Sequence, residues 1–168
     1  MIDRPTLLIC GSREASPVLI DYARRATLRA LENGWWIIAG DALGIDQVVA
    51  ETVRDHFQHA DELMYGMRVY GIGDAPRHGI GDNTGRIHFQ KLTGYTKQTV
   101  TRGRRDLHVY NDYIAISSYT DRDRYMVREA DKVLCIWNGS SPGTLAVYEY
   151  ADELGKEAWL KHEAFNRR

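Results

Sequence analysis

Three short segments of this chain combine glycines with hydroxyl or charged side chains, and each directly follows a run of apolar residues. Glycine lets a backbone come close to a ligand, while amides, hydroxyls and an arginine can hold phosphate oxygens. We therefore predict that these segments form loops that bind a phosphate group. The candidate ligand-binding residues are Gly11, Ser12, Arg13, Gly40, Asp41, Ala42, Gly44, Ser140, Ser141, Gly143 and Thr144.

Acidic side chains near these segments are candidates for a second kind of chemistry. Asp46 lies in the first turn of a predicted helix, where a carboxylate either interacts with the helix dipole or contacts a ligand. Glu149 follows Thr144 by five residues, and is either a solvent-facing helix acid or, with Asp46, a candidate catalytic carboxylate. Residues 121–124 form either a salt-bridged helix start or a charged rim above the pocket, and for Arg122 and Asp123 we favour the rim.

Other catalytic signatures do not occur in the sequence. It contains no Walker A lysine motif, no Gly-x-Ser-x-Gly elbow, no full Gly-x-Gly-x-x-Gly and no Cys-x-x-Cys pair. His56 and His59 are three residues apart but have no partner cluster, so we interpret them as surface residues. Cys10 and Cys135 each lie in an apolar run and are predicted to be buried, reduced thiols. We therefore predict no metal site and no cofactor.

Composition and length are those of a single globular domain covering residues 1–168. Hydrophobic residues make up 43% and charged residues 27%, and the formal net charge is −1, so nothing attracts the whole chain to DNA or to an anionic membrane. No apolar run is long enough to cross a bilayer, and the apolar run near Met1 is too short for a signal peptide. We expect a cytoplasmic protein that does not bind membranes.

Apolar strands alternate with helical patterns over the first part of the chain. Strands are predicted at 6–10, 35–39 and 67–71. Ser16 and Pro17 begin a helix that ends near Asn33-Gly34, and a second helix carries apolar residues from Ile45 to Val53. This order predicts parallel strands joined by right-handed crossovers.

The pattern is interrupted by a long insertion at about 72–110. This insertion is predicted to be a loop or a hairpin that turns around Thr93-Gly94, with a further strand at 112–117. Regular order then returns with a helix capped by Thr120 and ending near Asp131, a strand at 132–137, a helix at 144–154 and a short strand at 157–160. The fold class is therefore α/β: a Rossmann-like three-layer sandwich with a mostly parallel sheet and helices on both faces. In such sheets, ligands bind where loops meet at the carboxyl ends of the strands.

The motifs resemble those of the SLOG superfamily, which includes DNA-processing protein A and the LOG phosphoribohydrolases. Gly11-Ser12-Arg13 is similar to the family's "GSR", AGDALGIDQVVAE to its "GGAxGxDxxAxxxA", and residues 121–156 to its "RNxxMxxxADxxxAFWdGxSxGTxxxIexAxxxGK". The resemblance covers about two-thirds of the chain and omits residues 72–118. It implies a Rossmann-like fold that binds nucleotides or nucleotide-derived signals, often as a homo-oligomer.

Several positions depart from the family patterns. The loop 140–144 lacks the double glycine of the LOG motif "PGGxGTxxE", and Glu149 stands two positions later than the acid of that motif. Asp41 replaces the second glycine, which would place a negative charge near a phosphate, and Asp123 stands where asparagine is usual. These departures suggest an altered ligand.

Three hypotheses follow. The leading one is that the loops bind a nucleotide or nucleotide-derived small molecule. The second is a nucleoside monophosphate N-glycosidase that uses Glu149 or Asp46. The third is single-stranded nucleic-acid binding by the insertion, with Phe89 or Tyr95 stacking on bases. The basic residues of the insertion are Arg77, Arg86, Lys91, Lys97, Arg102, Arg104 and Arg105.

Overall fold

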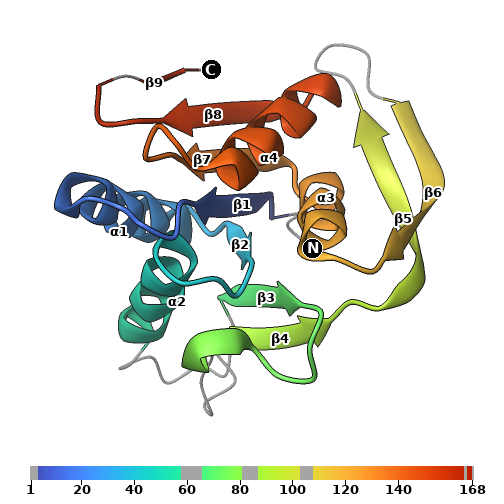
Figure 1. The fold of residues 1–168 in the computed structure, drawn as a ribbon, viewed down its shortest axis with the longest axis horizontal. Helices are drawn as coiled ribbons and strands as arrows, with labels where there is room; N and C mark the ends of the chain where they lie inside the picture. The colour runs from blue at the N-terminus through green and yellow to red at the C-terminus, as the bar shows by residue number, and fades with distance from the viewer. Residues whose placement is uncertain (1–3, 58–65, 81–86, 103–107, 165, 168) are drawn as a thin grey trace.

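A computed structural model describes residues 4–57, 66–80, 87–102, 108–164 and 166–167 (Figure 1). The central feature is a seven-stranded sheet in the order β4-β3-β2-β1-β7-β8-β9. All neighbouring strands in it are parallel except β9, which is antiparallel to β8. The strands are β1 (Thr6–Gly11), β2 (Trp36–Ala39), β3 (Met67–Gly71), β4 (Ile87–Lys91), β7 (Lys132–Ile136), β8 (Glu157–Lys161) and β9 (Asn166–Arg167).

Helices cover both faces of this sheet, which confirms the predicted three-layer α/β fold. Alternate residues of β1 belong to different cores: Leu7 and Ile9 pack with α1 and α2, whereas Leu8 and Cys10 pack with α3 and α4. This alternation follows from the two-residue period of a strand, and it buries β1 on both sides. The helices are α1 (Pro17–Glu32), α2 (Ile45–His56), α3 (Tyr119–Glu129) and α4 (Pro142–Glu153).

Capping residues decide where the helices begin. Ser16 caps α1 as predicted, because its side chain accepts a hydrogen bond from the backbone N–H of Leu19 at 3.3 Å. The cap of α3 is Ser118, whose hydroxyl accepts from the N–H of Asp121 at 3.2 Å, so the prediction of Thr120 as cap was wrong. Helix α4 begins at Pro142, two residues before the predicted start.

The predicted hairpin around Thr93-Gly94 was also wrong. Residues 87–91 form β4 and join the main sheet parallel to β3, because Ile87 and Phe89 pack into the core beneath α1 and α2. The hairpin is instead made by β5 (Gly94–Arg102) and β6 (His108–Ile116), which pair antiparallel and include most of the predicted strand at 112–117. Figure 1 shows this ribbon standing beside α3, apart from the main sheet.

The order in which strands are added to the sheet reverses between β1 and β7, which makes this position the topological switch point of the sheet. Strand β1 leads through α1 to β2 on one side, while β7 leads through α4 to β8 on the other. A crevice is expected at the carboxyl ends of β1 and β7, because their following loops diverge there. No helix within the described residues is long and apolar enough to cross a membrane.

Candidate functional site

A cavity of about 440 Å³ opens at this switch point. Its walls come from the loops after β1, β2 and β7, from the short 3-10 helix η1 (Arg77–Gly79) after β3, and from α3 and the first turns of α2 and α4. The structure therefore brings the three predicted loops together at one edge of the sheet. The predicted residues that line the cavity are Gly11, Arg13, Ala42, Asp46, Arg122, Asp123, Ser141, Gly143 and Thr144.

The other predicted residues do not line this cavity. Ser12, Gly40, Asp41 and Gly44 lie behind its walls, and Ser140 is exposed in the loop after β7. Glu149 lines a different cavity of about 250 Å³ between α3 and α4. The two candidate catalytic carboxylates therefore line neighbouring cavities, which share Asp123, Gly143 and Val147 in their walls.

Ser12 joins the three loops. Its backbone N–H donates to the carbonyl of Ile136 at 3.0 Å, and its hydroxyl oxygen accepts from the N–H of Asn138 at 3.0 Å. Its own carbonyl accepts from the N–H of Ile45 at the start of α2 at 3.3 Å. Because these groups are engaged and Ser12 is buried, the residue positions the loops.

Two glycines let these loops approach one another. Gly44 has a φ of +81°, and a Cβ at this position would lie 2.2 Å from the carbonyl oxygen of Arg13. A Cβ on Gly40 would lie 2.7 Å from Nη2 of Arg122. Glycine at these positions therefore leaves room for the loop after β1 and for the Arg122 side chain.

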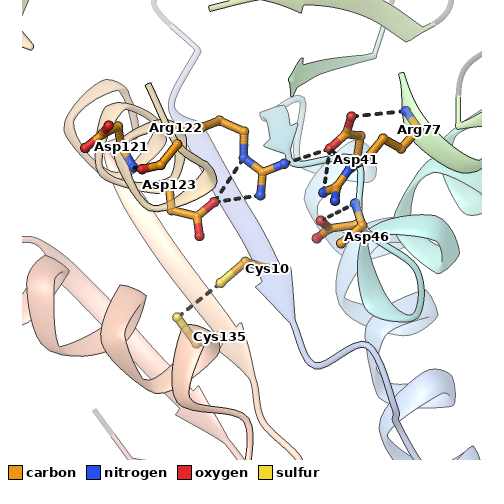
Figure 2. A network of polar contacts seen from close by, with 10 residues as sticks. Cys10, Asp41, Asp46, Arg77, Asp121, Arg122, Asp123 and Cys135 are labelled. Atoms are coloured by element: carbon orange, nitrogen blue, oxygen red, sulfur yellow. Dashed lines mark hydrogen bonds and ion pairs between the residues drawn. The ribbon is translucent and has the colours of Figure 1, made fainter. Parts of the chain in front are cut away.

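Asp41 is the centre of an ionic network formed by Asp41, Arg77, Arg122 and Asp123 (Figure 2). The Asp41 carboxylate is fully buried, and its Oδ1 accepts from Nη1 of Arg122 at 2.7 Å and from Nε of Arg77 at 3.0 Å. Its Oδ2 accepts from the backbone N–H of Arg77 at 3.1 Å. The charge that we expected near a phosphate is thus neutralised by two arginines.

Arg122 links this carboxylate to α3. Its Nε and Nη2 donate to Oδ1 of Asp123 at 3.0 and 2.7 Å, and only 6% of its side chain is exposed. Burial acts to lower the pKa of Arg122, but Asp123, Asp46 and Asp41 together raise it above its ordinary value. Arg122 therefore stays charged, and its three donating nitrogen atoms are committed to the network.

Arg77 also lines the cavity, where it lies over an aromatic ring. Its guanidinium lies 3.8 Å from the ring centroid of Tyr119, and 28% of its side chain is exposed. Arg122 lies 4.9 Å from the same ring. Sequence reasoning did not identify Tyr119, and it considered Arg77 only as part of the basic insertion.

The loop after β7 and the first turn of α4 contribute backbone amides to the cavity wall. Asn138, which we did not predict, accepts the backbone N–H groups of Ser140 and Ser141 on its Oδ1, both at 2.9 Å. The amides of Gly143 and Thr144, in the first turn of α4, have no acceptor among the described residues. An asparagine directly after a predicted strand is a signal for such a turn.

We call Gly143, Thr144 and Ser141 the anion seat. The hydroxyls of Ser141 and Thr144 lie 3.2 Å apart, and the side chain of Ser141 does not cap the helix. The partial positive charge of the α4 N-terminus faces the same cavity. An oxyanion is the chemical group that this arrangement can hold.

Asp46, in the first turn of α2, is a buried residue that also lines the cavity. Its Oδ2 accepts from the backbone N–H of Ala42 at 3.1 Å, so it braces the loop after β2. Its Oδ1 is buried and has no hydrogen-bond partner among the described residues. Burial raises the pKa of Asp46 to about 7, although Arg122 and the Ala42 N–H favour the charged form.

Cysteine and histidine form no metal centre in the described part of the chain, where no group of three or more metal-binding side chains occurs. Cys10 and Cys135 are free and buried, as predicted, and their sulfur atoms lie 3.4 Å apart on neighbouring strands (Figure 2). The hydrogen bond to Cys135 and burial raise the pKa of Cys10 well above its ordinary value. His56 packs against Phe57, and His59 lies outside the described residues.

The basic insertion is only partly described. Lys91 pairs with Asp74, and Arg77 belongs to the ionic network. Arg86, Arg104 and Arg105 lie outside the described residues.

The sequence matches no family model and no curated protein. Solved structures do resemble it, at low sequence identity. DNA processing protein A from Helicobacter pylori, which binds single-stranded DNA, aligns with a TM-score of 0.59 at 16% identity over 93% of this chain. This chain spans only 64% of the length of that protein chain.

Two further structures are proteins of the molybdenum cofactor. The molybdenum cofactor binding protein from Rippkaea orientalis aligns with a TM-score of 0.60 at 15% identity, over 97% of this chain and 79% of its own. The molybdenum cofactor carrier protein from Chlamydomonas reinhardtii gives 0.57 at 15%, over 94% and 76%. Identities this low establish the fold alone, and that fold is the Rossmann-like α/β arrangement that the sequence predicted.

Proposed function

We propose that this protein binds a small phosphate-bearing molecule, a nucleotide or a nucleotide-like heterocyclic monophosphate, in the cavity between β1 and β7. The observation that carries this proposal is the anion seat: two backbone amides without acceptors among the described residues, and two hydroxyls at the start of α4, all of them on residues that line the cavity. A phosphate is the common biological anion that such a helix start binds.

Arg13 supplies the charge that the anion seat lacks. It is exposed, lines the cavity and forms no ion pair with the described residues. Arg77 and Arg122, in contrast, are paired with carboxylates. Arg13 is therefore the cation that is available for a charge-assisted hydrogen bond to a phosphate oxygen.

The rest of the cavity suits a planar group. Its volume of about 440 Å³ lies within the roughly 300–1,000 Å³ typical of small-molecule sites. The guanidinium of Arg77, which lies 3.8 Å from the ring centroid of Tyr119, offers a surface on which a heterocycle can stack. Similar structures bind ligands as different as single-stranded DNA and the molybdenum cofactor, so the ligand class is inferred from the cavity.

Binding is favoured over cleavage because of where the acids lie. Glu149 lines the neighbouring cavity between α3 and α4 and not the main one, so the proposal gives it no part in the site. Glu14, Asp46 and Asp123 do line the main cavity, but Asp46 is braced by the Ala42 N–H and Asp123 is paired with Arg122. The proposal therefore assigns neither of them to the acid and the base that hydrolysis of a glycosidic bond ordinarily uses.

Titration calorimetry with AMP, GMP, CMP, UMP and inorganic phosphate tests the proposal. We expect saturable binding of at least one nucleotide, weakened about tenfold or more in Arg13→Ala, since a charge-assisted hydrogen bond is lost. Arg24→Ala removes an equally exposed arginine from α1 and should leave affinity unchanged. Absence of binding across this panel, or equal loss in both variants, would contradict the proposal.

A further inference from the structure

One polar atom of the cavity is left unexplained by the fold. Oδ1 of Asp46 is buried and has no hydrogen-bond partner among the described residues, and the residue as a whole is only 4% exposed. Buried polar atoms in proteins are almost always hydrogen-bonded, so an unpaired one on a residue of the cavity wall marks a place for a partner that the protein itself does not supply. The bracing bond to Ala42 uses the other carboxyl oxygen and leaves Oδ1 without a role.

Charges around Asp46 offer it no counter-ion in contact within the described part of the chain. Arg122 on α3 is hydrogen-bonded to Asp41 and Asp123, and both of these carboxylates act against ionisation of Asp46. The thiol of Cys10 on β1 also faces this region. The remaining charged groups of the cavity wall are Arg13, Glu14 and Arg77.

An anion in the seat would add a further negative charge to this environment. Ionised Asp46 would then face Asp41, Asp123 and the ligand with no ion pair of its own, whereas neutral Asp46 can donate a hydrogen bond. The two protonation states therefore make opposite demands on the ligand: the neutral acid needs an acceptor, and the carboxylate needs a donor.

We propose that Asp46 binds the ligand as a neutral acid and donates the proton on Oδ1 to an oxygen acceptor of the ligand, either a carbonyl or a phosphate oxygen. This assignment rests on the proposed function of the cavity. It makes Asp46 a specificity-determining residue that favours anionic, oxygen-rich ligands over ligands that present an amino group. At a pH where free Asp46 is ionised, binding takes up one proton from the solvent.

The electrostatics of the free protein make this state accessible. Burial raises the pKa of Asp46 to about 7, so a large share of the molecules carry the proton near neutral pH before any ligand arrives. A bound anion stabilises the neutral form further, because it repels the carboxylate.

Two substitutions test whether the side chain at position 46 donates a hydrogen bond to the ligand or accepts one from it. Asp46→Asn keeps the size of the side chain and mimics the neutral acid, because its amide can accept from Ala42 and still donate from the other atom. Asp46→Ala removes the donor. Asp21→Asn, on the exposed face of α1, serves as the matched control.

The experiment is calorimetry with AMP, GMP, CMP and UMP at pH 6.5, 7.5 and 8.5, in two buffers of different ionisation enthalpy. We expect wild-type affinity to fall up to about tenfold from pH 7.5 to 8.5, with proton uptake, since each pH unit above the pKa lowers the neutral fraction tenfold. The D46N variant cannot ionise at this position, so it should bind across this range without that loss, whereas D46A should bind several-fold more weakly. The phosphate of the probe titrates equally in all variants, so the difference between wild type and D46N isolates Asp46.

Each contrary result has a distinct meaning. Wild-type affinity that rises with pH, together with weak binding by D46N, would show that Asp46 accepts a hydrogen bond and would overturn the assignment. Unchanged affinity in D46A would overturn it as well. No binding by the wild-type protein would instead overturn the proposed function. If D46A does not fold, D46N and the proton uptake of the wild type still decide the question.

Discussion

The two walls of the cavity use their polar groups in opposite ways. On the side of α3 and the loop after β2, Asp41, Arg77, Arg122 and Asp123 satisfy one another. On the side of α4, the amides of the anion seat have no acceptor among the described residues. The difference indicates that the ionic network is mainly structural, whereas the anion seat is free to bind a ligand.

Burial explains why the walls differ. A charge removed from water must be paired, so the fully buried Asp41 requires its arginines whether or not a ligand is present. Amides at a helix start beside an open cavity can be satisfied by water until a ligand replaces it. Substitution of Asp41 in the ionic network should therefore affect mainly folding, and substitutions in the anion seat should affect mainly binding.

The largest effect is expected from Asp41→Ala. Removing this carboxylate leaves Arg122 buried with only Asp123 as an ion-pair partner among the described residues, and breaking a buried ion pair typically costs roughly 3–5 kcal/mol of unfolding free energy. Urea denaturation followed by circular dichroism measures the change. Asp21→Ala breaks the exposed pair with Arg25, where Asp21 is 64% exposed, and should cost less than about 1 kcal/mol. Similar losses in the two variants would remove the distinction between the walls.

A smaller loss is expected from Gly44→Ala. The substitution forces a side chain into a φ of +81° and brings its Cβ to 2.2 Å from the carbonyl of Arg13, so we expect a loss of roughly 2–4 kcal/mol. Gly34→Ala has a similar φ of +73° but no atom within 4 Å of the new Cβ, and should lose only about 1 kcal/mol. Thermal denaturation of both variants measures the cost of the steric clash as the difference between their melting temperatures. Equal melting temperatures would show that the loop after β1 can move to accommodate the new Cβ.

Asp46→Asn should change how stability depends on pH. The pKa of Asp46 is about 7 in the folded protein against an ordinary value of 3.8, so its stabilising contribution is complete below about pH 3.8 and is lost as the pH rises through 7. The free energy of unfolding of D46N, relative to wild type, should therefore increase by roughly 2–3 kcal/mol between pH 5 and pH 8. Urea titrations at both pH values measure this, and a constant difference would mean that Asp46 remains ionised.

Local patterns were sufficient to predict most of the fold. The residues of β3 were predicted in full, and β1, β2 and β7 within one residue at each end, because buried parallel strands are short apolar runs bounded by turn residues. The insertion was harder, because β4 is defined by its pairing with β3 and by the packing of Ile87 and Phe89 into the core. Such long-range contacts produce no local pattern of apolar residues in the sequence.

The cavity was predicted in outline and not in its internal pairing. Glycine-rich turns after strands were enough to locate Arg13, Asp46 and the residues of the anion seat at one edge of the sheet. That Asp41 pairs with Arg77 and Arg122, 36 and 81 residues away, depends on how α3 and the loop after β3 pack. Sequence reasoning therefore placed Asp41 at the phosphate, whereas the structure places it behind the wall.

The smallest effect on folding is expected in the α4 wall. Thr144→Val keeps the shape of the side chain and removes a hydroxyl that contacts Ser141 at 3.2 Å, so the free energy of unfolding should change by less than about 1 kcal/mol. If this hydroxyl donates to a bound phosphate, affinity for the nucleotide should fall roughly three- to tenfold. Thr120→Val, on the exposed start of α3, is the matched control and should bind as wild type does. Full affinity in T144V would show that the Thr144 hydroxyl does not contact the ligand. A large loss of unfolding free energy would show that this hydroxyl is structural.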